Sequence, residues 1–209
     1  GIDNVDGSSK SSTIEYTPNM LPDGLTARIA YAPSSGATSA DKASSGYAAD
    51  PEGSGYDITL TATDAILGVP GLTIYGGMSS INQDGTQSQY DGDQDESTYA
   101  IVYAAGGFTV GYQYSEEDLG RSSTEQQYEN TGYGITFQIN DDLSVGYNNY
   151  ESDQTNTTNV TAEAESLQLA YTFGGASIRL AEASVDNSAY QTANSYDRDG
   201  TTLSVSLAF

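Results

Sequence analysis

The chain lacks cysteine, histidine and tryptophan, and its 209 residues include only 6 lysines and arginines against 29 aspartates and glutamates. Without cysteine and histidine it has no thiolate nucleophile, none of the usual zinc ligand sets and no Ser-His-Asp triad. The absence of cysteine also excludes a disulfide framework. A formal net charge of −23 repels the phosphates of nucleic acids, whose binding depends on lysine and arginine. We therefore expect no nucleic-acid partner.

Long apolar segments are missing too. No run of 18 or more apolar residues is present, so the sequence predicts no transmembrane helix. A basic-plus-apolar signal peptide is absent, which indicates either a mature chain or one that was never secreted. Hydrophobic residues make up 36% of the chain, below the globular average of about 45–50%, so a conventional buried core would be small. Tyrosine, threonine and valine are nevertheless too plentiful for a disordered chain.

What the sequence does contain is an alternation of apolar and polar residues, repeated in segments of roughly ten residues. A period of two is typical of strands with one apolar face. In GTTLSVSLAF, for example, Leu203, Val205 and Leu207 point one way and Thr202, Ser204 and Ser206 the other. Eleven segments are predicted to be strands: 11–17, 24–32, 55–64, 71–81, 96–104, 107–115, 131–138, 142–152, 165–173, 176–186 and 200–209.

The connections between these segments alternate in length. PNMLPDG, AILGVPG, AAGG, INDD and GG are short, whereas the stretches 33–54, 82–95, 116–130, 153–164 and 187–199 are long and polar. Short turns at one end and long loops at the other predict an up-and-down antiparallel sheet with two unlike ends. No helical segment is predicted, and no linker divides the chain, so residues 1–209 are expected to form a single domain.

The apolar face needs an apolar surrounding. In a soluble β protein it would line the interior, but eleven strands with so few leucines and phenylalanines would have to fill a large space. If instead the apolar face meets lipid and the polar face lines a water-filled lumen, both faces are satisfied without a large core. Closing the sheet into a barrel also leaves no backbone group without a hydrogen bond in hydrocarbon. The fold class predicted is therefore all-β, a transmembrane up-and-down β-barrel. Tyrosines within and near the strand ends fit aromatic girdles, although tyrosine favours any sheet: Tyr31, Tyr75, Tyr99, Tyr103, Tyr112, Tyr114, Tyr147, Tyr150 and Tyr171.

Two stretches carry a resemblance to a known family. The final alternating strand ending in Phe209 resembles the last strand of Gram-negative outer-membrane barrels, in which such an ending is the membrane-assembly signal. The stretch SSTIEYTPNMLPDGLTARIAYAP is similar to the general-porin pattern of a strand, a Tyr-x-x-Pro turn and a further alternating strand. The matching residues there are Ile14, Tyr16, Pro18, Gly24, Leu25, Ile29 and Tyr31.

This resemblance to general porins implies the following expectations. In sixteen-stranded porins eleven strands follow the constriction loop, so the chain would be the C-terminal portion of such a barrel, with residues 1–10 the end of that loop. Because bacterial barrels have even strand numbers, the alternative is a complete barrel of ten or twelve strands. Porins catalyse nothing, and the implied function is passive diffusion of small hydrophilic solutes and ions. The implied setting is a homotrimer among lipids and lipopolysaccharide of the bacterial outer membrane.

A second function also fits the pattern, namely a non-conducting adhesion or structural barrel whose long acidic loops are the functional surface. For a pore, the charges on the polar face matter most, because an arginine facing lipid near mid-membrane costs about 2–4 kcal/mol. Alternation predicts four pore-lining residues: Glu15, Arg28, Asp57 and Arg179. They would lie opposite a constriction-loop remnant containing Asp3 and Asp6, although pairing with carboxylates in the barrel wall explains the arginines as well. The acidic total favours cations and neutral solutes over anions.

One loop offers a possible ion site. QYDGDQDES places Asp91, Asp93 and Asp95 at alternate positions, followed by Glu96, a spacing similar to that of calcium loops. It lacks the glycine at position 6 and the glutamate at position 12 of an EF-hand. The two interpretations are a solvated acidic loop and a divalent cation, Ca²⁺, bridging the loop to lipopolysaccharide or to a neighbouring subunit. No other cofactor is expected.

Overall fold

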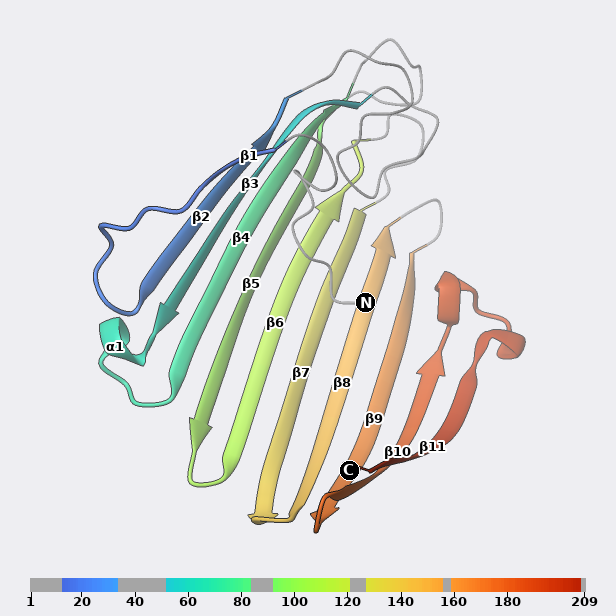
Figure 1. The fold of residues 1–209 in the computed structure, drawn as a ribbon. Helices are drawn as coiled ribbons and strands as arrows, with labels where there is room; N and C mark the ends of the chain where they lie inside the picture. Colours follow the sequence, from blue (N-terminus) through green and yellow to red (C-terminus); the bar gives the residue numbers. More distant parts are fainter. Residues whose placement is uncertain (1–12, 34–51, 84–91, 121–126, 156–158, 208–209) are drawn as a thin grey trace.

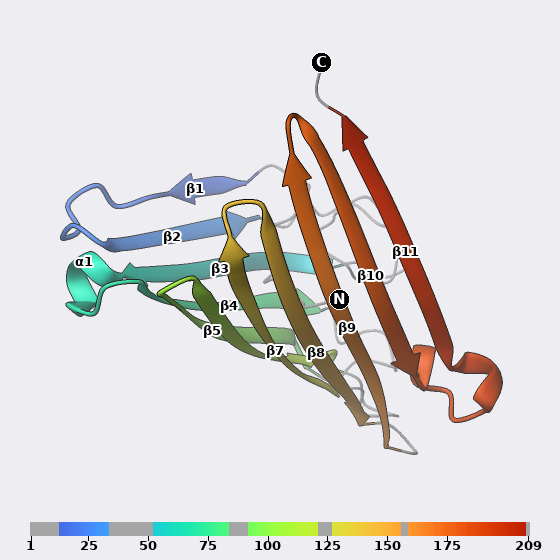
Figure 2. The ribbon, with the colours of Figure 1, turned by 90° about the horizontal axis from the view of Figure 1, so that it is seen from below.

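One antiparallel sheet makes up the fold. The computed structural model describes residues 13–33, 52–83, 92–120, 127–155 and 159–207. Within them eleven strands pair only with their neighbours in sequence, in the order β1 to β11 (Figure 1). The sheet is strongly bent and twisted, as Figure 2 shows, and no described residues pair β1 with β11. The predicted number of strands and their up-and-down order are confirmed.

The strand bounds are β1 (Ile14–Tyr16), β2 (Leu25–Ala32), β3 (Glu52–Thr63), β4 (Leu72–Gln83), β5 (Gln94–Ala105), β6 (Phe108–Asp118), β7 (Gln127–Asn140), β8 (Leu143–Thr155), β9 (Val160–Phe173), β10 (Ala176–Asp186) and β11 (Arg198–Leu207). Three helical turns correct the prediction of no helical segment: α1 (Asp64–Leu67), η1 (Ser188–Tyr190) and η2 (Asn194–Tyr196). Among the described residues, no helix is long and apolar enough to cross a membrane.

Several strands extend beyond their predicted ends on the side of the long loops. The alternation predicted 131–138 and 165–173, whereas β7 starts at Gln127 and β9 at Val160. In these extensions the face that is apolar further along the strand carries polar residues such as Glu129 and Glu163, and backbone pairing continues regardless, as between Glu116 and Glu129. Hydrophobic alternation therefore marks the height of the apolar band rather than the length of the strand.

The register divides the side chains between two faces, because directly opposed residues in a ladder point to the same side of the sheet. The apolar face carries Ile58, Ile101, Val110, Ile135, Leu169 and Leu203, and the polar face carries Thr59, Thr98, Gln113, Thr136, Gln168 and Thr202. Both series match the predicted alternation. Two tyrosines expected in the girdles, Tyr75 and Tyr150, instead share the polar face with Thr61 and Ala164.

Burial is inverted relative to a soluble protein. On the apolar face Ile58 is 39% and Leu169 41% exposed, so no described residue covers this face. The most buried polar side chains lie on the other face: Ser79, Gln94, Glu96, Ser115, Asn130 and Ser152. Removing apolar side chains from water lowers the free energy. An apolar surface this large is therefore typical of a protein that contacts lipid or another protein there.

The turn before β4 depends on Gly71. Its φ of +78° lies in the left-handed region, and its carbonyl accepts the amide of Ala104 at the end of β5 over 2.9 Å. A Cβ atom at Gly71 would lie 2.1 Å from the Ala104 carbonyl oxygen. Gly106, in the turn between β5 and β6, also has a positive φ, +58°. A Cβ atom added there would meet no other atom within contact distance.

These two glycines provide a matched test of the turn geometry. Gly106→Ala should cost about 1–2 kcal/mol, the penalty of a side chain in left-handed conformation. Gly71→Ala should cost more, because the end of β5 must also move. Urea unfolding of the protein in detergent micelles, followed by tyrosine fluorescence, measures both variants. Equal midpoints for the two would contradict this account of Gly71.

Candidate pore wall

The four residues predicted to line the pore all lie on the polar face. Glu15 and Asp57 both pair with Ala30, Arg28 pairs with Thr59, and Arg179 pairs with Ala170 and Ser204. The structure thus brings Glu15, Arg28 and Asp57 together on β1–β3. Arg179 lies apart from them on β10. Asp3, Asp6 and Phe209 lie outside the described residues.

Arg28 forms an ion pair with Glu15 on the neighbouring strand. Its Nη2 lies 2.5 Å from Glu15 Oε2, and the two side chains are 55% and 48% exposed. An ion pair this exposed contributes little stability, about 0–1 kcal/mol. Its main consequence is electrostatic, because the positive charge of Arg28 is offset locally. This matches the predicted alternative of an arginine paired with a carboxylate in the wall.

Carboxylates form a row across one part of the polar face. Following the register sideways from β1 to β6 gives Glu15, Ala30, Asp57, Ser79, Glu96 and Glu117 at one level. We call Glu15, Asp57, Glu96 and Glu117 the acidic row. Sequence alternation identified the first two members. It missed Glu117, which falls in the predicted loop 116–130, and Glu96, which begins the predicted strand 96–104 but was interpreted as a ligand of the acidic loop before it.

Glu96 is the most buried member of the acidic row, with 7% of its surface exposed. Its carboxylate accepts hydrogen bonds from Ser79 Oγ over 2.8 Å and from Gln94 Nε2 over 3.1 Å. Gln94 Nε2 also donates to Glu117 over 2.9 Å. The amide therefore bridges two carboxylates on adjacent strands, which offsets part of the cost of burying them.

A second polar network lies on β6–β8. The Asn130 amide oxygen accepts from Tyr150 and Ser152 over 2.6 Å each, and its Nδ2 donates to Ser115 over 3.2 Å. The Ser152 hydroxyl lies 2.6 Å from that of Tyr190, which belongs to η1. The connection between β10 and β11 is therefore attached to the polar face at its long-loop end. Sequence reasoning could not find this contact, since nothing in the loop indicates which strand it meets.

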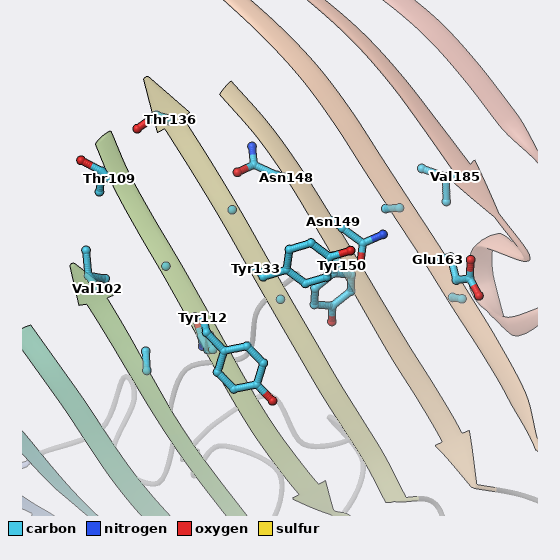
Figure 3. A pocket seen from close by; sticks show the side chains of 17 residues that line it. Val102, Thr109, Tyr112, Tyr133, Thr136, Asn148, Asn149, Tyr150, Glu163 and Val185 are labelled. Atoms are coloured by element: carbon cyan, nitrogen blue, oxygen red, sulfur yellow. The ribbon is translucent and has the colours of Figure 1, made fainter. Parts of the chain in front are cut away.

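The middle of the polar face is open, and the one charged residue that lines it, Glu163, occupies a register position of the opposite face. A hollow of about 740 Å³ lies over β5–β10, and Figure 3 shows Thr109, Thr136, Asn148 and Tyr150 around it. Glycines on the same face, including Gly111, Gly132 and Gly134, have no side chain and so leave open space between these polar residues. Hydroxyl and amide groups beside small residues leave this part of the face able to hydrogen-bond with water.

The predicted divalent-cation ligands do not converge. Glu96 lies on the polar face, whereas Asp95 pairs with Ser80 and Asp118 on the other. Asp93 accepts from Asn82 Nδ2 over 3.2 Å, and Asp91 lies outside the described residues. In the described part of the chain, no group of three or more acidic side chains is placed to hold an ion. A calcium site remains a prediction for the loop alone.

Comparison with known proteins agrees with this geometry. The family model described as Gram-negative porin matches residues 1–174. The chain belongs to the Gram-negative porin family. The match confirms the resemblance inferred from the sequence and places the protein in the bacterial outer membrane. No curated protein matches the chain.

Solved structures show the same fold at low identity. A porin refined at 1.8 Å resolution is similar, with a TM-score of 0.63 and 15% identity over 94% of this chain and 60% of that one. OmpT of Vibrio cholerae, folded in vitro, has a TM-score of 0.58 and 14% identity over 83% of this chain and 53% of its own. The same protein expressed in the outer membrane gives 0.55 and 12%, over 84% and 54%. The chain thus spans a little over half the length of these proteins.

Adjacent residues of β5 test which face meets lipid. Ile101 lies on the apolar face and Val102 on the polar face, opposite Gly111. Ile101→Arg should destabilise the protein by about 2–4 kcal/mol in a bilayer, since its charge would face hydrocarbon. Val102→Arg should be nearly neutral, because its charge would face water. The free energy of unfolding from lipid vesicles, measured by urea titration, distinguishes the two, and the reverse order of cost would contradict the assignment of the faces.

Proposed function

We propose that the protein forms a water-filled channel through which small hydrophilic solutes and ions cross the outer membrane by passive diffusion, without catalysis. The supporting observation is the sorting of side chains by the register. Over the height of the apolar band, one face carries hydroxyl, amide and small side chains together with Arg28 and Arg179, and the other exposes aliphatic and aromatic side chains. A polar wall on one side and a lipid-compatible wall on the other are what a pore requires. No observation favours a non-conducting adhesion barrel.

The assembly and surroundings we propose follow from the family. They are a homotrimer embedded among outer-membrane lipids and lipopolysaccharide. The large exposed apolar face supports burial against lipid or neighbouring subunits.

We further propose a preference for cations over anions. The acidic row places four carboxylates on the polar face of β1–β6, and among the described strands only Arg28 offsets them there. Fixed charges on the wall of a narrow aqueous path attract counter-ions and repel co-ions.

Bilayer recordings test both proposals. Protein purified from outer membranes should give stepwise conductance in a planar bilayer, and a KCl gradient should give a reversal potential of cation-selective sign. Absence of conductance would contradict the channel, and an anion-selective potential would contradict the preference.

Matched variants then test the acidic row. Asp57→Asn removes one charge from the polar face and should lower the potassium-to-chloride permeability ratio by about twofold at low salt, where screening is weak. Asp95→Asn removes the same charge from the opposite face and should change the ratio less. An equal effect of the two would indicate that charges act through the net total rather than through the wall.

A further inference from the structure

The polar face is divided by charge. All members of the acidic row lie on β1–β6. The polar-face positions of β7–β11 carry no carboxylate among the described residues, because every acidic residue of these strands has the opposite orientation. These acidic residues are Glu129, Glu151, Asp153, Glu163, Glu165, Glu182, Asp186 and Asp199. One part of the wall is therefore acidic, and the other is neutral apart from its arginines.

Arg179 differs from the other two arginines in the described part of the chain. Arg28 is paired with Glu15, and Arg198 donates to the backbone carbonyls of Ser195 and Asp197 at the base of its loop. Within the described residues no hydrogen bond or ion pair involves Arg179, whose side chain is exposed on the polar face. Its guanidinium therefore keeps its five N–H donors for water or for a solute.

Arg179 is one of the residues that line an open hollow of about 390 Å³. Its polar-face lining comes from four strands besides β10 and consists of hydroxyl, amide and small residues: Thr136, Ser144, Gly146, Gln168, Ala170, Ala181, Thr202 and Ser204. Ser144, Ala170, Arg179 and Ser204 lie at one level, and Gly146, Gln168, Ala181 and Thr202 at the next. The neighbours on β9 and β10, Ala170 and Ala181, leave space for a bound group beside the arginine.

We propose that Arg179 and this hollow form a binding subsite for the carboxylate group of a permeating solute. The inference rests on the proposed channel function and defines a solute class for it. A guanidinium binds a carboxylate through two parallel charge-assisted hydrogen bonds, and hydroxyl and amide donors complete the set. No carboxylate on this part of the wall competes for the arginine. The subsite lies near the short turns, since Arg179 is the fourth residue of β10.

The test uses outer-membrane protein in planar bilayers at low salt, with succinate as the probe and glycerol as the uncharged control. Succinate should reduce the KCl current in a saturable way, and glycerol should not. Arg179→Gln should raise the succinate concentration needed for half-maximal block about tenfold. This is the factor expected for losing a charge-assisted hydrogen-bonded pair that is partly exposed to water. Arg179→Lys should restore part of the block, because the charge remains while the two-pronged geometry is lost.

Arg28→Gln is the matched control. It removes the same charge from the same face, eight strands away along the sheet, but from an arginine already paired with Glu15. We expect its half-blocking concentration to stay within about twofold of the wild-type value, since screening limits its effect at Arg179. Equal losses in Arg28→Gln and Arg179→Gln would overturn the subsite in favour of a general electrostatic effect. If Arg179→Gln leaves the saturable block by succinate unchanged, the subsite is also overturned. If the protein gives no conductance at all, the proposed channel is refuted instead.

Discussion

Backbone hydrogen bonding in a medium without water is the constraint on which this structure depends. A strand in hydrocarbon must pair along its whole length with a neighbour, because an unbonded amide or carbonyl costs several kcal/mol there. From β2 to β11 each described strand pairs with the next over most of its length. Once the pairing of the strands is set, the face on which each side chain lies is also set. A shift of the pairing by one residue would move every side chain of that strand to the opposite face. The pairing that satisfies the backbone thereby also decides which charges meet water.

The same constraint explains a composition that is too polar for a conventional core. Apolar side chains are needed only on one face and only over the height of the membrane, so 36% hydrophobic residues suffice. The most buried side chains can then be polar, provided that they are bonded to one another. Glu96, held by Ser79 and Gln94, and Asn130, held by three hydroxyl partners, meet that requirement. These networks add side-chain links between strands at the end where hydrophobic alternation has stopped.

Sequence alternation was sufficient for the strand order and for the face of Arg28, Asp57 and Arg179, because a two-residue period is a local property. It failed where a side chain's role depends on strands distant in sequence. For Tyr75 and Tyr150 the local period was itself sufficient, since each lies an odd number of residues from an apolar-face residue of its own strand, Ile74 or Tyr147, and the register confirms the polar face rather than the girdles. Glu96, at the start of the predicted strand 96–104, was also expected to be a loop ligand, but its neighbours on β4 and β6 bury it in the wall. The ends of β7 and β9 were also underestimated, since their extensions carry polar residues where the rest of the strand has its apolar face.

The division of the polar face also shows why net charge is a poor guide to selectivity. The carboxylates of the described strands β7–β11 all sit on the side of the sheet away from the polar wall, most of them near the long loops, and salt screens them over about 8–10 Å. In the proposed channel, an ion at the wall would instead meet the acidic row on β1–β6 and Arg179 on β10. A protein of charge −23 can therefore present an unpaired guanidinium in a neutral hollow to a passing carboxylate. Position in the register, more than the sum of charges, determines what a solute encounters.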